Sequence, residues 1–213
     1  MIVVSACFRI ETAWIPKLPD VHVVRTSVGQ AAASSLARAL ERLLPDVPTL
    51  ILSTGFCGGL VPALHPGKLV LAEVIHESGE TIPVDSALFA KAKEALRAAR
   101  LDFVCGPIKS SDQLVQTKEE KRRLQSEGTV AVDMESGPLA QWAREKRIGF
   151  LCLRAVLDPV DQDLPFTASS SLIHSMLRHP LATFNTVKLA VYSGRHIGRA
   201  IPAVISGHSG GTG

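Results

Sequence analysis

The sequence predicts a single α/β domain in which a mixed central sheet lies between two layers of helices. Short apolar segments rich in β-branched residues alternate with helical segments along the 213 residues, which is the pattern of this fold class. Polar and acidic residues follow directly after several of the apolar segments. Because ligands bind outside the carboxyl ends of strands in such sheets, the pattern also predicts where the functional site lies.

Strands are predicted where a short segment is mostly apolar, namely at residues 1–8, 21–26, 49–53, 68–75, 102–109, 129–132 and 149–155. Helices are predicted at residues 31–44, 87–100, 117–125 and 136–147, and residues 169–195 are largely helical with a break near Pro180.

Local signals support these boundaries. Pro45 and Pro48 end the first helix. Asp85 or Ser86 can cap the second. The basic helix to residue 125 opens with the spacing of a capping box, and we expect its charges to be solvated. Residues 54–60 are rich in glycine and predict a turn that a ligand can approach closely.

Composition excludes several classes of function. A net charge of +3 and an aromatic content of 5% argue against a nucleic-acid partner. We expect neither a leader sequence nor a membrane span, because the N-terminus lacks the basic region of a leader and no apolar stretch reaches about 18 residues. Histidines are scattered, so we expect no metal. The cysteines lie in or beside apolar segments without metal spacing, which predicts reduced thiols in a cytoplasmic protein; they are Cys7, Cys57, Cys105 and Cys152.

Two carboxylates, Asp133 and Glu135, flank Met134 where an apolar strand passes into a helix. A helix N-terminus favours an ionised carboxylate by ~0.3–1 kcal/mol. We therefore interpret Glu135 as a substrate-binding anion. Asp158 also follows an apolar strand, where burial and like charge would raise its pKa as a general acid requires. On the residues alone, a helix cap or a solvated turn is the stronger interpretation of Asp158.

Six segments in this order resemble the purine nucleoside phosphorylase and methylthioadenosine/S-adenosylhomocysteine nucleosidase superfamily over about residues 1–175: 5–11, 27–30, 54–60, 110–112, 132–135 and 153–158. The resemblance implies a nucleoside phosphorylase-like domain at residues 1–205, followed by a glycine-rich tail at 206–213 that we expect to be disordered. It also implies cleavage of the ribosyl N-glycosidic bond of a purine nucleoside in a homodimer or larger oligomer, with no cofactor beyond inorganic phosphate as a co-substrate.

The resemblance also implies roles for individual residues. Glu135 would hydrogen-bond the ribose hydroxyls, Met134 would pack on the sugar, and Asp158 would protonate the leaving purine at N7. Glu11 would position an attacking water, although Arg9 competes for that place. The turn at Gly58 and the residues Leu114 and Val115 would line the purine pocket. Cys57, which lies in the glycine-rich turn, and Asp133 are further candidates for contact with the substrate.

Some residues depart from the family pattern. Asp133 stands in place of a glutamate, Pro159 follows the catalytic aspartate, and Leu114 replaces an aromatic residue that stacks on the base. The short loop between residues 75 and 85 would leave the ribose 5′ side open. That feature resembles a bacterial subgroup associated with hopanoid biosynthesis, whose members are thought to release adenine from adenosylhopane.

The residues leave alternatives open. Phosphorolysis would need a cation and backbone N–H groups, which Arg9, Gly29 and Gly55 would supply, whereas hydrolysis would need Glu11 as a base. The basic C-terminal helix would either rest on an anionic membrane or serve ordinary packing or oligomerisation. A nucleoside-binding protein without turnover is a second hypothesis. A Rossmann-type oxidoreductase is a third, against which the missing GxGxxG motif argues.

Overall fold

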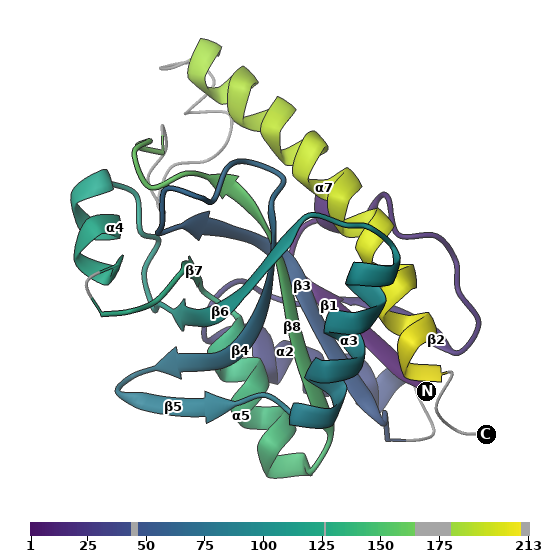
Figure 1. Cartoon of the computed structure of the whole chain (residues 1–213). Coiled ribbons are helices and arrows are strands. Elements are labelled where there is room, and N and C mark those ends of the chain that lie inside the picture. Colours follow the sequence, from purple (N-terminus) through teal and green to yellow (C-terminus); the bar gives the residue numbers. More distant parts are fainter. Residues whose placement is uncertain (44–46, 126, 165–179, 210–213) are drawn as a thin grey trace.

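The computed structural model describes residues 1–43, 47–125, 127–164 and 180–209 (Figure 1). Its strands are β1 (Ile2–Ala6), β2 (Val21–Arg25), β3 (Leu50–Gly59), β4 (Leu69–Glu77), β5 (Glu80–Pro83), β6 (Phe103–Ser110), β7 (Ala131–Asp133) and β8 (Gly149–Asp158). Its helices are α1 (Arg9–Thr12), α2 (Ala31–Leu43), α3 (Ser86–Ala98), α4 (Lys118–Gln125), α5 (Ser136–Lys146) and α7 (Pro180–Ser209).

The described strands form one mixed sheet of eight, in the order β2-β1-β3-β7-β6-β4-β5, with β8 paired to β3 and β4. One parallel group contains β2, β1, β3 and β8, and a second contains β4, β6 and β7. The groups meet in the antiparallel pairs β3–β7 and β4–β8. The carboxyl ends of β1, β3 and β8 therefore share one edge, and β7 begins beside it because it is antiparallel to β3.

Helices cover both faces of this sheet, as the sequence predicts. The side chains of α2 and α5 pack into one buried apolar cluster. Those of α3 and α7 pack into a second cluster, and Figure 1 shows these two helices side by side. The predicted three-layer α/β/α arrangement is confirmed.

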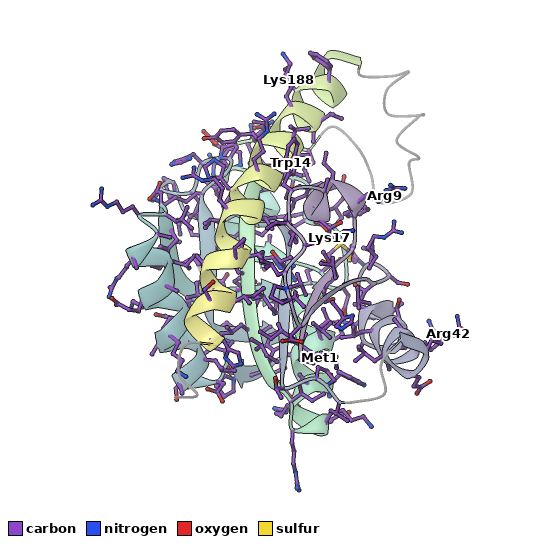
Figure 2. The ribbon with its side chains drawn as sticks, turned by 90° about the vertical axis from the view of Figure 1, so that its right-hand side faces the viewer. Met1, Arg9, Trp14, Lys17, Arg42 and Lys188 are labelled. Carbon is purple, nitrogen blue, oxygen red and sulfur yellow. The ribbon has the colours of Figure 1, made fainter. Side chains whose placement is uncertain are left out.

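The long helix α7 also holds α1 against the sheet. Gly194 and Gly198 of α7 leave no room for a Cβ atom, because one would lie 2.7 Å from the carbonyl oxygen of Ile10 and the other would overlap the backbone of Trp14. Arg195 lies over the ring of Trp14, with 4.8 Å between the guanidinium carbon and the ring centroid. Trp14 and α7 lie together in Figure 2. None of the described helices combines the length and hydropathy needed to cross a membrane.

The structure differs from the predicted elements at several places, and α1 and β5 were not predicted at all. Residues 54–59 continue strand β3 instead of turning, because β7 and β8 supply hydrogen-bonding partners on both sides. Strand β8 runs on to Asp158, and residues 206–209 belong to α7 instead of the tail. Lys121 is buried inside the basic helix that we expected to be solvated. The predicted helical residues 169–179 and the tail residues 210–213 lie outside the described part of the chain.

Candidate active site

A cavity of about 530 Å³ opens beside the shared edge of β1, β3, β7 and β8. Three of its lining residues carry carboxylates at the positions that the sequence predicted for chemistry: Glu11, Glu135 and Asp158. They come from segments that are far apart in the chain and meet only because of the strand order. The volume is in the range of pockets that bind small molecules.

Glu135 stands immediately before α5 and is held from the opposite side by Gly29. The backbone N–H of Gly29, which has a φ of +67°, donates to Glu135 Oε1 over 3.1 Å. Burial and, after it, the charge on Asp133 raise the pKa of Glu135 to about 7, although Arg154 and the Gly29 N–H oppose the rise. The carboxylate is therefore less firmly ionised than the helix N-terminus alone predicts.

Glu11 is buried on α1 and accepts three backbone hydrogen bonds. Its Oε2 accepts from the N–H groups of Cys7 at 3.0 Å and Phe8 at 2.8 Å, and its Oε1 accepts from that of Phe56 at 3.0 Å. Burial raises the pKa of Glu11, while these donors and Arg154 lower it. A carboxylate fixed in this way is suited to orient or deprotonate a water molecule.

Asp133 forms a buried ion pair with Arg154 of β8, whose side chain is about 1% exposed. Arg154 Nε donates to Asp133 Oδ2 over 2.6 Å, and Arg154 also donates to Ser53 Oγ over 2.9 Å. Asp133 Oδ1 accepts from the hydroxyl of Ser136 over 2.7 Å. Burial is the largest single influence and lowers the pKa of Arg154, but the combined effect of Asp133, Cys152, Glu135 and Glu11 raises that pKa well above its usual value.

Asp158 ends β8 and is buried against Lys121, with which it forms an ion pair. Burial raises the pKa of Asp158, and Lys121 opposes the rise. The raised pKa agrees with the expectation for a general acid. Its cause is burial, however, and not the acidic residues that follow in the sequence.

The remaining walls of the cavity are largely apolar. They include the predicted residues Cys57, Gly58, Leu114, Val115 and Met134, together with Val28, Phe56, Leu157 and Leu164. Gly58 leaves no free space for a side chain, since a Cβ atom there would lie 3.2 Å from Val132 and 3.4 Å from Asp158. A flat apolar ligand would therefore lie against bare backbone at this point.

Comparison with known proteins identifies the family of the chain. The model of the phosphorylase superfamily matches residues 3–179. The chain belongs to the phosphorylase superfamily.

Solved structures share the superfamily fold at low identity. The 5′-methylthioadenosine/S-adenosylhomocysteine nucleosidase of Helicobacter pylori has a TM-score of 0.75 and 18% identity, with 96% of this chain and 97% of that chain covered. The futalosine hydrolase of Helicobacter pylori gives the same values. The nucleosidase of S. pneumoniae has a TM-score of 0.75 and 15% identity, with coverage of 97% and 99%.

The three residues predicted to bind phosphate are Arg9, Gly29 and Gly55. They do not come together in the cavity as hydrogen-bond donors. Arg9 is exposed on α1 and points away from the sheet in Figure 2; it does not line the cavity. The N–H of Gly29 is already used by Glu135. Gly55, with a φ of +138°, leaves space for Glu11 and Arg154, because a Cβ atom there would lie 2.8 Å from Glu11 Oε1 and 3.0 Å from an Arg154 nitrogen.

Sequence reasoning missed two buried cations of this site. Arg154 carries a signal in hindsight, because it is a lone cation inside the apolar strand segment 150–156. Lys121 carries a weaker one: it lies three residues before Leu124 and so shares the buried face of α4. No group of described residues is arranged to hold a metal ion, and the four cysteines are unpaired.

Proposed function

We propose that the protein cleaves the N-glycosidic bond of an adenine nucleoside that carries an apolar 5′ substituent. The observation that carries this proposal is the convergence of Glu11, Glu135 and Asp158 on one cavity from three separate segments. Breaking the bond from C1′ to N9 builds positive charge on the sugar and negative charge on the base. Such a reaction needs an anion beside the ribose and an acid beside the base.

The residues divide these tasks by position. Glu135 accepts hydrogen bonds from the ribose hydroxyls, and its charge stabilises the cationic sugar. Met134 packs on the sugar. Asp158, next to the bare backbone of Gly58, donates a proton to N7 of the purine so that the base leaves neutral. Apolar side chains at Leu114 and Val115 contact the faces of the base.

We favour hydrolysis over phosphorolysis. Glu11 and Arg154 converge beside Gly55, which supports a role for Glu11 in holding an attacking water. Arg9 is exposed, and the N–H of Gly29 is engaged. A phosphate dianion would therefore find no free donor in the cavity among the three residues predicted to bind it.

The 5′ side of the cavity supports an apolar substituent. Phe8 and Val28 line the cavity, yet their side chains are 52% and 44% exposed. Exposed apolar residues beside an opening favour a ligand that extends through it. A hopanoid such as adenosylhopane would meet this requirement, as would the smaller thioether of methylthioadenosine, so the length of the substituent is the feature to test.

Adenine release tests this proposal. Purified protein should release adenine from 5′-methylthioadenosine or from an adenosine with a longer apolar 5′ group, equally well with and without phosphate. Asp158→Asn should lower kcat by ~10²–10⁴-fold, because the proton donor is lost. Full activity of this variant would disprove the acid assignment, and a strict need for phosphate would establish phosphorolysis. Binding without release in the wild-type protein would point to a nucleoside-binding role.

We also propose that the protein works in the cytoplasm as a homodimer or larger oligomer, with α7 in peripheral contact with a membrane. The outer side of α7 carries Phe184, Val187 and Tyr192 as exposed apolar residues. Lys188 lies over the ring of Phe184, 4.4 Å from its centroid. Aromatic residues beside a cation are typical of surfaces that contact anionic lipid.

A further inference from the structure

Lys121 is a buried cation that the proposed reaction has not yet used. Its side chain has an exposed fraction of 0%. The ammonium group pairs with Asp158 Oδ2 and donates to the carbonyl oxygens of Pro159 at 2.9 Å and Gln162 at 2.6 Å. An ammonium has three N–H donors, and all three have partners here. Such complete pairing is what a buried charge requires.

The pair formed by Lys121 and Asp158 lies directly behind the wall of the cavity. A Cβ atom on Gly58 would lie 3.4 Å from Asp158 Oδ2 and 3.8 Å from Lys121 Cε. Gly58 and Asp158 line the cavity, but Lys121 does not. Lys121 therefore reaches a ligand only through the carboxyl group of Asp158.

A purely structural role would not need a charge at this place. Other hydrogen bonds already join the start of α4 to the segment after β8. The N–H of Lys118 donates to Asp163 Oδ1 over 2.8 Å, and the N–H of Leu164 donates to the carbonyl oxygen of Gln116 over 3.0 Å. What Lys121 adds is a positive charge aimed at one oxygen of Asp158.

We propose that Lys121 is a positioning residue for the proton transfer from Asp158 to the leaving base. This inference rests on the proposed function. Lys121 holds Oδ2, so Oδ1 carries the proton. In the step, the Oδ1–H bond breaks, an N–H bond forms at N7, and the electron pair of the glycosidic bond leaves with the base. The oxygen of the attacking water bonds to C1′, and Glu11 accepts the proton that this water loses and returns it to solvent. The remaining carboxylate is stabilised by the ammonium group, and a proton from water restores the acid after release.

The groups that face Asp158 define the expected pH dependence. Lys121 of α4 lowers the pKa of Asp158 against the effect of burial. Cys57 of β3 also faces it, and burial raises the pKa of this thiol well above its usual value, which keeps it neutral. Loss of Lys121 therefore raises the pKa of Asp158. Since activity needs the protonated acid, the alkaline fall in rate should move to higher pH.

A double-mutant cycle tests this inference with adenine release from 5′-methylthioadenosine. We expect Lys121→Met to lower kcat by ~10–100-fold with little change in KM, because a higher pKa makes Asp158 a weaker proton donor. Its alkaline limb should move up by about one pH unit or more. In an Asp158→Asn background the same change should cause no further loss, and Lys121→Arg should recover part of kcat. Arg122→Met, on the exposed side of the same helix, is the matched control and should behave as wild type.

Other outcomes separate the two proposals. The inference would be overturned if Lys121→Met lowered kcat equally in the wild-type and Asp158→Asn proteins, or if the alkaline limb of the pH profile did not move. Either result would show that Lys121 has only a structural role. An active Asp158→Asn variant would instead overturn the proposed function. A second measurement needs no turnover: carbon-13 NMR of labelled aspartate, assigned with Asp158→Asn, should show a higher pKa of Asp158 in Lys121→Met or Lys121→Gln. An unchanged pKa would contradict the role of Lys121.

Discussion

At the scale of single residues, Glu135 shows how burial and a helix N-terminus compete. The helix N-terminus favours the ionised form by ~0.3–1 kcal/mol. Burial and the charge on Asp133 raise the pKa of Glu135 from 4.5 to about 7, and each pKa unit corresponds to about 1.4 kcal/mol. Burial therefore dominates over the helix N-terminus, and a bound ribose that donates hydrogen bonds would favour ionisation.

The raised pKa of Glu135 predicts a pH-dependent gain in stability for Glu135→Gln. Below pH 4.5, the pKa of Glu135 in the unfolded chain, this residue is protonated in both the folded and the unfolded wild type. Removing its charge therefore does not change the free energy of unfolding in this range. Between 4.5 and about 7, the unfolded state ionises while the folded state keeps its proton, so the wild type loses stability. Above about pH 7 the variant should be more stable by ~3.5 kcal/mol relative to its difference at acid pH.

Urea unfolding at several pH values measures this difference. Glu94→Gln, at an exposed glutamate of α3, is the control for the loss of one carboxylate. If the difference in free energy of unfolding between Glu135→Gln and the wild type did not change with pH, the raised pKa of Glu135 would be contradicted.

At the scale of elements, packing between α1 and α7 decides where Glu11 lies. α1 has four residues and cannot be stable alone. Gly194 and Gly198 let the backbone of α7 approach α1 closely enough to fix it. The position of a carboxylate in the cavity therefore depends on two glycines nearly two hundred residues later in the chain.

We expect Gly198→Ala to reduce both stability and activity. The added methyl group would overlap Trp14, and overpacking of this kind costs ~1–3 kcal/mol. Because α1 would shift, kcat for adenine release should fall as well. Thermal unfolding and kinetics together measure the effect. Ser206→Ala, at an exposed site of the same helix, should change neither, and an unaltered Gly198→Ala variant would show that α1 has room to move.

At the scale of the whole molecule, α7 extends beyond the body of the described chain in Figures 1 and 2, and Lys188 is labelled near its far end. Phe184 on the same part of the helix is 56% exposed. The cavity and this helix therefore offer two separate apolar surfaces, one concave and one projecting. A lipid-like substrate would make use of both.

Vesicle sedimentation tests this arrangement. The protein should bind vesicles rich in phosphatidylglycerol, and binding should weaken at high salt because the attraction to Lys188 is screened. A double variant, Phe184→Ser with Lys188→Glu, should lose this binding while retaining adenine release from 5′-methylthioadenosine. Arg42→Glu, on α2, serves as a charge-matched control for the lysine change. If the double variant sedimented with the vesicles as well as the wild type does, α7 would be excluded as the membrane contact.

The sequence by itself determined the alternation of strands and helices, the mixed α/β class and the three carboxylates at strand ends. It did so because hydrophobic periodicity and capping signals are local and each element satisfies them within its own length. Residues 54–59 show the limit, since glycines predicted a turn and neighbouring strands made them part of β3.

Only the tertiary structure decided the partners of the charges. Asp133 meets Arg154, and Asp158 meets Lys121, across 21 and 37 positions of the chain. The ionisation of Glu135 depends equally on burial that other segments supply. Desolvation and ion pairing are properties of the assembled interior, so no local pattern encodes them.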